Sequence, residues 1–303
     1  QIRLIKKNIL RKQKIKGYAF DKIGDNFDHF YKNHLKFKLT NAQKRVIKEI
    51  RNDLGSGAQM NRLLQGDVGS GKTIVAFMAA LIAIGNGFQA CMMTPTEILS
   101  YQHYNKFKDV CKALNINIKV LTGSSKTSYK KQLKESLKQG EINLLIGTHA
   151  LIYDSVEFEN LGLAIIDEQH KFGVAQRSKL WHKNKFPPHI LIMTATPIPR
   201  TLAMSVYGDL DMSVIDELPP GRKYIKTFHQ TQRDRLKLLD FLKKEIDKGR
   251  QAYVVYPLIK ESEKLDFKDL LDGYETFSRD FPMPEYQISI VHGKMNNEDK
   301  EYE

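Results

Sequence analysis

Residues 66–73 have the types and spacing needed to bind the phosphates of a nucleotide. Their sequence, GDVGSGKT, fits the pattern G-x-x-x-x-G-K-[ST] without a gap. In such a loop the glycines let backbone N–H groups curl around phosphate oxygens, and the N-terminus of the following helix adds its positive end. We expect Lys72 to reach the β- and γ-phosphates and Thr73 to hold Mg²⁺ through its hydroxyl group. The expected phosphate-binding set is Gly66, Asp67, Val68, Gly69, Ser70, Gly71, Lys72 and Thr73.

Two carboxylates supply a second chemical signal. Asp167 and Glu168 follow directly after the apolar run 163–166. An apolar strand that ends in a carboxylate is the Walker B arrangement, in which Asp167 would hold Mg²⁺ through its water shell. Glu168 would orient and deprotonate the attacking water. The alternative is an acidic pair that ends a strand and has no catalytic role. The pair follows the phosphate loop at residues 66–73 in the order expected of such ATPases, and this favours ATP hydrolysis with Mg²⁺.

The surrounding chain alternates between short apolar runs and helical patterns, which would position these residues. Continuous apolar strands between helices are typical of a parallel sheet that is covered on both faces. We therefore expect an α/β fold, a doubly wound parallel sheet of the P-loop NTPase type. Strands are expected at 62–64, 90–93, 118–121, 144–146, 163–166 and 190–193, and helices at 74–84, 97–114 and 128–139.

Polar clusters follow these strands at the point where each one ends. In parallel α/β sheets, ligands bind beyond the carboxyl ends of the strands. The clusters are therefore expected to share one edge of the sheet with the phosphate loop, and we call this edge the rim. Its clusters lie at residues 94–97, 122–124, 147–149, 167–170 and 194–197.

A helix is also expected just upstream of the phosphate loop. Thr40 or Asn41 can cap a helix whose apolar face lies within residues 46–50. The side-chain amide of Gln43 both donates and accepts, so it could bind the edge of an adenine base. From this residue alone, an ordinary surface glutamine is the better interpretation.

Composition and charge bound the class of protein. The 303 residues are 41% hydrophobic and 27% charged, as in soluble globular chains. The net charge is +13, and residues 1–50 hold fourteen Lys and Arg against four Asp and Glu. Such an excess predicts a polyanionic partner, most simply nucleic acid, although a solvated helix face that binds nothing would look the same.

The ends and the cysteines point to a cytoplasmic fragment. No apolar run approaches the length of a membrane span, and no signal peptide is expected. Cys91 and Cys111 provide neither a disulfide framework nor zinc-ligand spacing. Because the chain starts at Gln1, we expect a fragment or a trimmed chain. Residues 1–15 form an amphipathic basic pattern, which predicts a helical connector more than a membrane-surface helix.

The domain organisation follows from a composition break. The sequence LPPGR at residues 218–222 is a linker signal. We expect a basic helical connector over 1–36, a nucleotide-binding domain over 37–218 and a partial second α/β domain over 219–303. Only 82 residues follow Gly221, which is short for a doubly wound domain. In this part, strands are expected at 224–228, 252–256 and 288–291, and a helix at 234–248.

Several motifs together resemble a known family. Residues 66–73, 95–99, 147–151 and 167–170 are similar to helicase motifs I, Ia, Ic and II. With the additional tracts, the sequence resembles the RecG family of superfamily 2 DNA helicases over about residues 37–303. The additional tracts are FGVAQR at 172–177, TATPIPRTL at 194–202, YGDL at 207–210, LPPGR at 218–222, PLIKESE at 257–263 and HGKM at 292–295.

The resemblance implies a structure and an activity. It implies one complete RecA-like lobe and a truncated second lobe, which use ATP and Mg²⁺ to remodel branched DNA such as stalled forks and Holliday junctions in recombination and repair. It implies that Gln43 binds adenine, and that Phe37, Leu39 and Thr40 also belong to the nucleotide-binding set. The implied catalytic set is Lys72, Asp167, Glu168, Gln169 and His170. The implied DNA-contacting and coupling residues are Pro95, Thr96, Glu97, Thr122, Gly123, Gly147, Thr148, His149, Gln176, Arg177, Thr194, Ala195 and Thr196.

The resemblance also predicts what surrounds this chain. The family's wedge domain is expected before residue 1, and motifs V and VI, with the arginine that contacts the γ-phosphate, are expected after residue 303. The isolated chain is therefore expected to bind ATP but to hydrolyse it weakly. A bacterial, cytoplasmic and nucleoid-associated monomer without membrane contact is expected.

Other classes remain as alternatives. A transcription-repair coupling factor, a translocase on double-stranded DNA, shares residues 194–202 but is expected to differ in motif II and to lack YGDL at 207–210. RNA helicases of the DEAD-box type fit less well, because the fourth residue of motif II is His170. A fragment that binds ATP and DNA without efficient turnover is the main non-enzyme alternative. A metabolic P-loop kinase is disfavoured by the polar rim and the +13 charge.

Overall fold

The computed structural model describes residues 15–153, 155–167, 186–196, 210–219, 225–256 and 263–292, together with Met295 and Asp299. The chain divides into two compact units, Gln1–Arg222 and Lys223–Glu303. Each unit is described by itself. Among the described residues, none of the helices combines the length and the apolar character that a membrane crossing requires.

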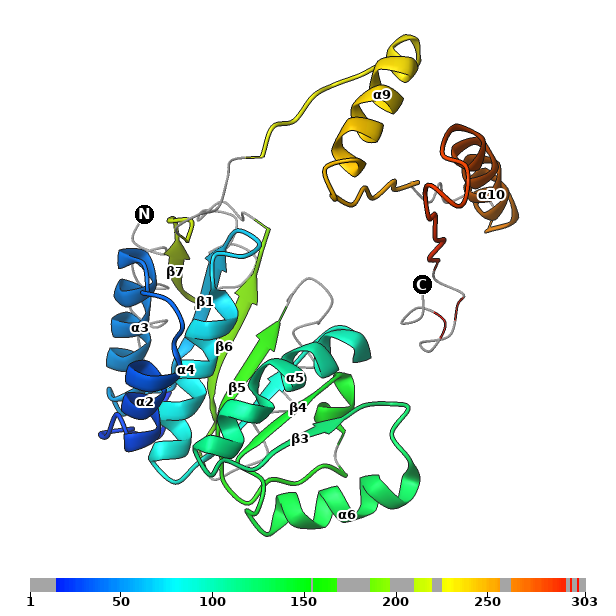
Figure 1. Ribbon diagram of the computed structural model, residues 1–303. Coiled ribbons are helices and arrows are strands. Elements are labelled where there is room, and N and C mark those ends of the chain that lie inside the picture. The colour runs from blue at the N-terminus through cyan, green and yellow to red at the C-terminus, as the bar shows by residue number, and fades with distance from the viewer. Residues whose placement is uncertain are drawn as a thin grey trace, which may run out of the picture. The chain divides into compact units, whose positions relative to one another are not determined.

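The first unit is built on a parallel sheet (Figure 1). Within the described residues its seven strands lie in the order β3-β4-β2-β5-β6-β1-β7. The six predicted strands are confirmed. Their bounds are β1 Asn61–Gly66, β2 Gln89–Met93, β3 Ile118–Leu121, β4 Leu144–Gly147, β5 Leu161–Asp167 and β6 His189–Thr194. The seventh strand, β7 (Asp211–Ile215), was not predicted, because its edge position leaves only Ser213 and Ile215 buried.

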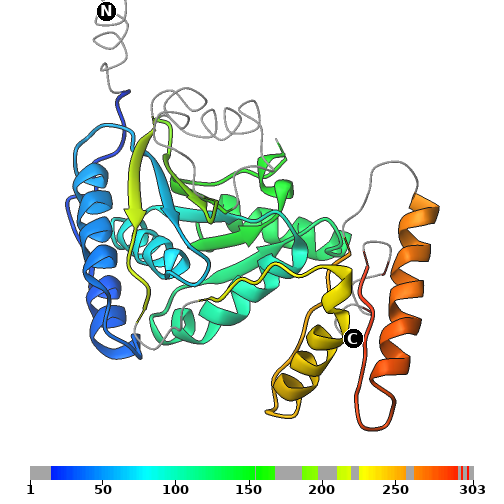
Figure 2. The ribbon, with the colours of Figure 1, turned by 90° about the horizontal axis from the view of Figure 1, so that it is seen from above.

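Helices connect these strands. The predicted helices are confirmed as α3 (Asn41–Leu54), α4 (Lys72–Gly85), α5 (Glu97–Ala113) and α6 (Thr127–Lys138). Helix α4, in cyan, lies beside α3, in blue (Figure 2). Two short elements were not predicted. Helix α2 (Asp25–His29) continues directly into the π-helix Phe30–His34, and the 3-10 helix His149–Ile152 follows β4.

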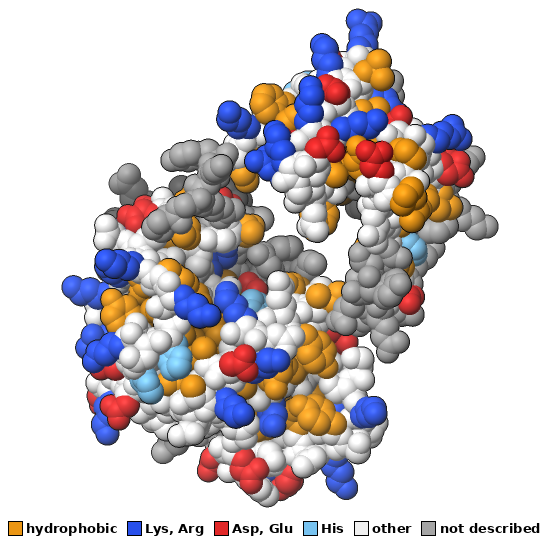
Figure 3. Space-filling model, viewed as in Figure 1, with side chains coloured by type: hydrophobic (Ala, Val, Ile, Leu, Met, Phe, Trp, Pro, Cys, Tyr) orange, Lys and Arg blue, Asp and Glu red, His pale blue; other side chains and the backbone are white. Residues whose placement is uncertain are grey.

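Basic side chains are spread over the surface of the first unit. On the face seen in Figure 3, Lys and Arg side chains occur on several elements, with Asp and Glu side chains among them. Among the described residues on this face, the Lys and Arg side chains are therefore spread over the surface rather than gathered in one patch.

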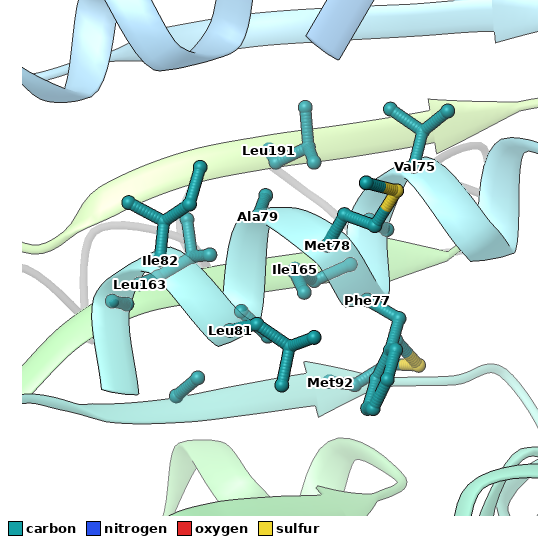
Figure 4. Packing of buried hydrophobic residues seen from close by; sticks show 14 of the residues in the cluster. Val75, Phe77, Met78, Ala79, Leu81, Ile82, Met92, Leu163, Ile165 and Leu191 are labelled. Atoms are coloured by element: carbon teal, nitrogen blue, oxygen red, sulfur yellow. The ribbon is translucent and has the colours of Figure 1, made fainter. Parts of the chain in front are cut away.

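The core has two layers, one on each face of the sheet. Successive strand residues point to opposite faces, so Ile165 packs under α4 while Ile166 packs on the side of α6. Helix α4 is buried along ten consecutive residues from Ile74 to Ala83, which is why its sequence is apolar all round (Figure 4). Phe77 of this helix stacks on Phe107 of α5, with ring centroids 4.0 Å apart. The predicted sheet with both faces covered is thus confirmed.

Residues 15–36, expected as part of a connector, pack against the first unit. Phe30 meets Phe77 edge to face at 5.1 Å between ring centroids. The ring of His189, at the start of β6, accepts a hydrogen bond at Nδ1 from the Met60 backbone N–H (2.9 Å) and donates from Nε2 to the carbonyl of Tyr18 (3.0 Å). Burial lowers the pKa of His189 to about 4. Residues 1–14 lie outside the described part, and the domain boundary at residue 37 stays a prediction.

The second unit contains helices α9 (Arg235–Ile246) and α10 (Glu263–Asp280) and the 3-10 helix Gln232–Asp234. The helix predicted over 234–248 is confirmed as α9, and α10 was not predicted. The strand predictions at 224–228, 252–256 and 288–291 are wrong for the residues that the structure describes, which form no ladder there. These apolar runs are extended but exposed, as at Tyr253 (87%) and Val255 (84%). A parallel strand needs hydrogen-bonded neighbours, and no described segment of this unit provides one.

Candidate nucleotide-binding site

The phosphate loop connects the end of β1 to the start of α4. Gly69 and Gly71 adopt φ values of 77° and 92°, a region that favours glycine. A Cβ atom on Gly66 would lie 2.6 Å from Oγ of Ser70, and one on Gly71 would overlap Nε2 of Gln43. The loop therefore needs its glycines both for backbone conformation and for close packing.

The Lys72 side chain lies over this loop. Its ammonium group donates to the carbonyls of Gly66 (2.7 Å) and Asp67 (3.0 Å). Because α4 begins at Lys72, the positive end of the helix dipole lies at the same loop. Oγ of Ser70 is fully buried and has no hydrogen-bond partner among the described residues. The Lys72 ammonium, the Ser70 hydroxyl and the start of α4 can donate hydrogen bonds to phosphate oxygens. The glycines of the loop leave space that side chains would fill, so the site fits a polyphosphate.

Helix α3 is fastened to the phosphate loop by Gln43. Thr40 caps α3 in a capping box: Oγ1 of Thr40 accepts from the Gln43 N–H (3.2 Å), and Oε1 of Gln43 accepts from the Thr40 N–H (2.9 Å). Nε2 of Gln43 donates to the carbonyl of Ser70 at 2.7 Å. The amide predicted to bind adenine is thus buried and turned toward the loop. Phe37, beside it in the prediction, is 49% exposed, whereas Leu39 is buried.

Strand register brings Asp167 to the same edge of the sheet. Asp167 of β5 pairs with Met193 of β6, which in turn pairs with Leu64 of β1. Two strand spacings, roughly 10 Å, therefore separate the Asp167 backbone from β1. Thr194, the next residue of β6, lies between them and shares a 2.8 Å hydroxyl–hydroxyl hydrogen bond with Thr196.

A histidine that the sequence analysis missed contacts this carboxylate. Nε2 of His103, on α5, lies 3.0 Å from Oδ2 of Asp167. The two side chains are 10% and 13% exposed. A single histidine on the buried face of a helix carries no sequence signal, because its partner lies 64 residues further on.

The metal site predicted at Thr73 and Asp167 is sparse in protein ligands. Among the described residues, no group of three or more His, Cys, Asp or Glu side chains could hold a metal ion. Mg²⁺ usually keeps several waters and is bound by one or two protein groups plus substrate phosphates, and the assignment of Thr73 and Asp167 to it stays a prediction.

Three predicted catalytic residues and two predicted DNA-contacting residues have no described position. They lie outside the described part of the chain, and their assignments stay predictions: Glu168, Gln169, His170, Gln176 and Arg177.

The rim beyond β2 is a network of hydroxyl groups. Thr96 caps α5 by accepting from the Leu99 N–H (3.3 Å). Oγ1 of Thr94 donates to the Thr96 carbonyl (2.9 Å) and lies 2.7 Å from Oγ of Ser100. Pro95 lies between the two threonines. The network holds the first turn of α5 against the end of β2.

Glu97 braces this turn to the end of β3. Its carboxylate accepts from the backbone N–H (2.9 Å) and the hydroxyl (2.5 Å) of Ser124. Thr122 and Gly123 precede this serine, and Oγ1 of Thr122 lies 3.1 Å from Oγ of Ser125. A carboxylate would repel DNA phosphates, so the structure gives Glu97 a bracing position, and its DNA contact stays a prediction.

The rim beyond β4 is closely packed. A Cβ atom on Gly147 would overlap the carbonyl of Leu121 in β3. Thr148 is buried, and its hydroxyl has no partner among the described residues. His149 is exposed, with its ring edge to face with Tyr153 at 5.9 Å. The predicted rim is therefore assembled from β2, β3, β4, β5 and β6 at one edge of the sheet.

A sequence model of the DEAD/DEAH box helicase family matches residues 40–205, more than half of the chain. The chain belongs to this family. The match contains the phosphate loop, Asp167 and the rim.

Relatives within this helicase family are close in sequence. The chain is 50% identical over 295 residues to the ATP-dependent DNA helicase RecG of Aquifex aeolicus, covering 96% of this chain and 37% of the relative. It is 50% identical over 268 residues to that of Bacillus subtilis, covering 88% and 39%. A structure of RecG bound to a three-way DNA junction matches with a TM-score of 0.74 and 43% identity, over 88% of this chain and 34% of that one. The chain thus spans little more than a third of these relatives.

Proposed function

We propose that this chain is the motor core of an ATP-dependent DNA helicase or translocase that acts on branched DNA, such as stalled forks and Holliday junctions, in recombination and repair. One observation carries the proposal: the phosphate loop, Asp167 and the hydroxyl-rich rim lie at the carboxyl ends of neighbouring strands. The similarity to RecG proteins, one of them bound to a three-way DNA junction, supports branched DNA as the substrate.

The nucleotide would lie along the phosphate loop. Lys72 would exchange its contacts with the loop carbonyls for contacts with the β- and γ-phosphates. Thr73 would hold Mg²⁺ through its hydroxyl and Asp167 through water, and the metal would neutralise charge that develops on the phosphates. Glu168 would orient the attacking water.

The adenine end of ATP would lie near α3. Phe37 offers an exposed ring on which a base can stack. The Gln43 amide already bonds Ser70 and Thr40, but it retains a second N–H and a second acceptor lone pair for the base edge. Base recognition and loop position would then depend on the same side chain.

DNA would contact the rim through its backbone. Hydroxyl and backbone N–H groups bind phosphate oxygens without reading sequence, as a translocase requires. Thr194 and Thr196 lie between Asp167 and the phosphate loop along the rim, a position from which they would link the state of the nucleotide to the grip on DNA. We further propose a monomer in the bacterial cytoplasm, associated with the nucleoid.

A second candidate function is binding of ATP and DNA without efficient turnover. It is favoured by the second unit, whose described residues contain helices but no sheet. In phosphoryl transfer an arginine placed against the γ-phosphate contributes on the order of 10³–10⁵ in rate, and in this family we expect it in motif VI, after residue 303.

Phosphate release at saturating ATP tests both candidates. The rate is measured without DNA, with single-stranded DNA and with a synthetic fork, on this chain and on a chain that continues through motif VI. A motor core predicts fork-stimulated turnover in the longer chain and weak turnover in this one. Equal, fork-independent rates in both chains would contradict the helicase proposal, and a full rate in this chain would contradict the second candidate.

A further inference from the structure

His103 places an imidazole against the carboxylate that is assigned to the metal. A carboxylate that holds Mg²⁺ is ionised and can only accept, so in that state Nε2 of His103 would be the donor in the 3.0 Å contact. Both side chains are largely shielded from water. Among the described residues, no other side-chain hydrogen bond to Asp167 occurs, so His103 fixes the orientation of this carboxylate.

The same helix face reaches the rim. The hydroxyl of Ser100, three residues before His103, lies 2.7 Å from the Thr94 hydroxyl and 3.2 Å from the carbonyl of Thr96, so its one proton serves one of these two contacts at a time. Residues three and four apart lie on one face of a helix. Seven residues of helix, roughly 10 Å, join Thr96 to His103. Helix α5 therefore connects the hydroxyl network of the rim to the Asp167 carboxylate by a short rigid segment.

We propose that His103 is a positioning residue that orients Asp167 toward the hydrated Mg²⁺ and, through α5, couples DNA contact at the rim to metal binding. This inference rests on the proposed function. A core histidine with a purely structural contact is the competing explanation. The two differ in what they predict for metal affinity, because an outer-shell partner of a ligand typically affects that affinity by about 10–100-fold.

The experiment measures the Mg²⁺ concentration that gives half-maximal binding of a fluorescent ATP analogue. His103→Leu keeps the bulk of the side chain but removes the donor, and we expect the half-maximal concentration to rise about tenfold. His103→Gln places an N–H near the position of Nε2, and we expect it to restore most of the wild-type value. Cys111→Ala, a buried change on the same helix, is the matched control and should leave the value unchanged.

Two additional measurements separate positioning from stability. Nucleotide affinity in EDTA should be equal in wild type and His103→Leu, because only the metal-dependent part changes. Should His103→Leu fail to fold, His103→Asn retains a polar side chain that is too short to reach Asp167, and it should show the same metal defect. Equal Mg²⁺ dependence in the wild type and the folded position-103 variants would overturn the inference.

Adding forked DNA tests the coupling. In the wild type we expect the fork to lower the half-maximal Mg²⁺ concentration, and in His103→Leu we expect this ratio to fall to about one. An unchanged ratio in the variant, or no effect of the fork in the wild type, would overturn the coupling. A wild-type chain that binds no nucleotide at any Mg²⁺ concentration would instead overturn the proposed function.

Discussion

The side chain of Gln43 donates a 2.7 Å hydrogen bond to the backbone carbonyl of Ser70, and this bond fastens α3 to the phosphate loop. The same amide closes the capping box of α3 through Thr40. A residue that sequence alone suggests for base recognition is therefore also part of the loop's support.

We expect Gln43→Ala to lower both stability and nucleotide affinity. The variant loses half of the capping box and leaves the Ser70 carbonyl without its partner, which together cost about 1–2 kcal/mol in the free energy of unfolding. Urea unfolding and a fluorescent-nucleotide titration measure the two effects. The exposed Gln102→Ala serves as the control. A variant as stable as that control would show that the amide contributes nothing to the loop.

Replacing Gly71 by alanine should do more damage than the same change at Gly87. Both residues have positive φ, so each substitution carries a backbone cost of about 1–2 kcal/mol. Gly87 has open space around it, whereas a Cβ on Gly71 would displace the Gln43 amide. We therefore expect only Gly71→Ala to weaken ATP binding as well. Equal losses of unfolding free energy together with normal ATP affinity would contradict this arrangement.

Lys72→Ala should abolish tight ATP binding while leaving the fold intact. Lys72 is the only cationic side chain within residues 66–73, and its ammonium lies over the loop. A fluorescent-nucleotide titration gives the affinity, and circular dichroism checks the fold. Glu168→Gln is the informative companion: it should retain binding and lose turnover in the longer chain. Unchanged affinity in Lys72→Ala would remove the phosphate-loop assignment.

Stability should fall with acid as His189 becomes protonated. Burial holds its folded-state pKa at about 4, below the ordinary value of 6.5. A lowered histidine pKa means that the stabilisation is complete above pH 6.5 and is lost as the pH falls toward 4. The change amounts to roughly 3 kcal/mol across this window. Urea unfolding at pH 7 and pH 4.5 measures it, with the change at the partly exposed His34, His34→Gln, as the control.

The variant His189→Asn tests whether the acid-dependent loss of stability comes from this ring. If it folds, it should lack most of the loss between pH 7 and pH 4.5, whereas His34→Gln should retain it. An equal acid loss in both variants would assign the effect to other groups.

Deleting residues 1–14 should weaken DNA binding in a salt-dependent way. This segment holds six Lys and Arg and no acidic residue. The deletion leaves intact the antiparallel backbone β-bridge between Lys16 and Ala58. For every DNA phosphate that the segment neutralises, its deletion should reduce the slope of log affinity against log salt by about 0.7–0.9. Fluorescence anisotropy with a labelled fork gives the slope. An unchanged slope with normal ATP affinity would mean that the segment does not bind DNA.

Much of the first unit could be predicted because its strands are buried on both faces. Runs such as Leu163–Ile166 are apolar without interruption, and only a covered parallel sheet accommodates them. Edge strand β7 escaped prediction because it is only partly buried. In the second unit the same apolar signal failed, since the run at 252–256 has no described neighbour with which to form a ladder.

The site was predictable where motif spacing fixes chemistry and unpredictable where tertiary contacts do. The phosphate loop and Asp167 follow from local sequence. His103 and the bracing of Glu97 by Ser124 depend on contacts 64 and 27 residues away along the chain, and no local pattern encodes such contacts.

The hydrogen bond between His189 and Tyr18 has a practical consequence for handling the protein. His189 begins β6, so its bond to Tyr18 holds residues 15–18 at the side of the sheet where the strands begin. The backbone hydrogen bond from the Gln59 N–H to the Ile15 carbonyl is a second anchor, just before β1. The six residues of β1 then span roughly 20 Å before the phosphate loop begins. A tag or surface tether joined directly to Ile15, in place of residues 1–14, would therefore leave the nucleotide-binding side of the sheet facing away from the support and accessible to ATP in an immobilised assay.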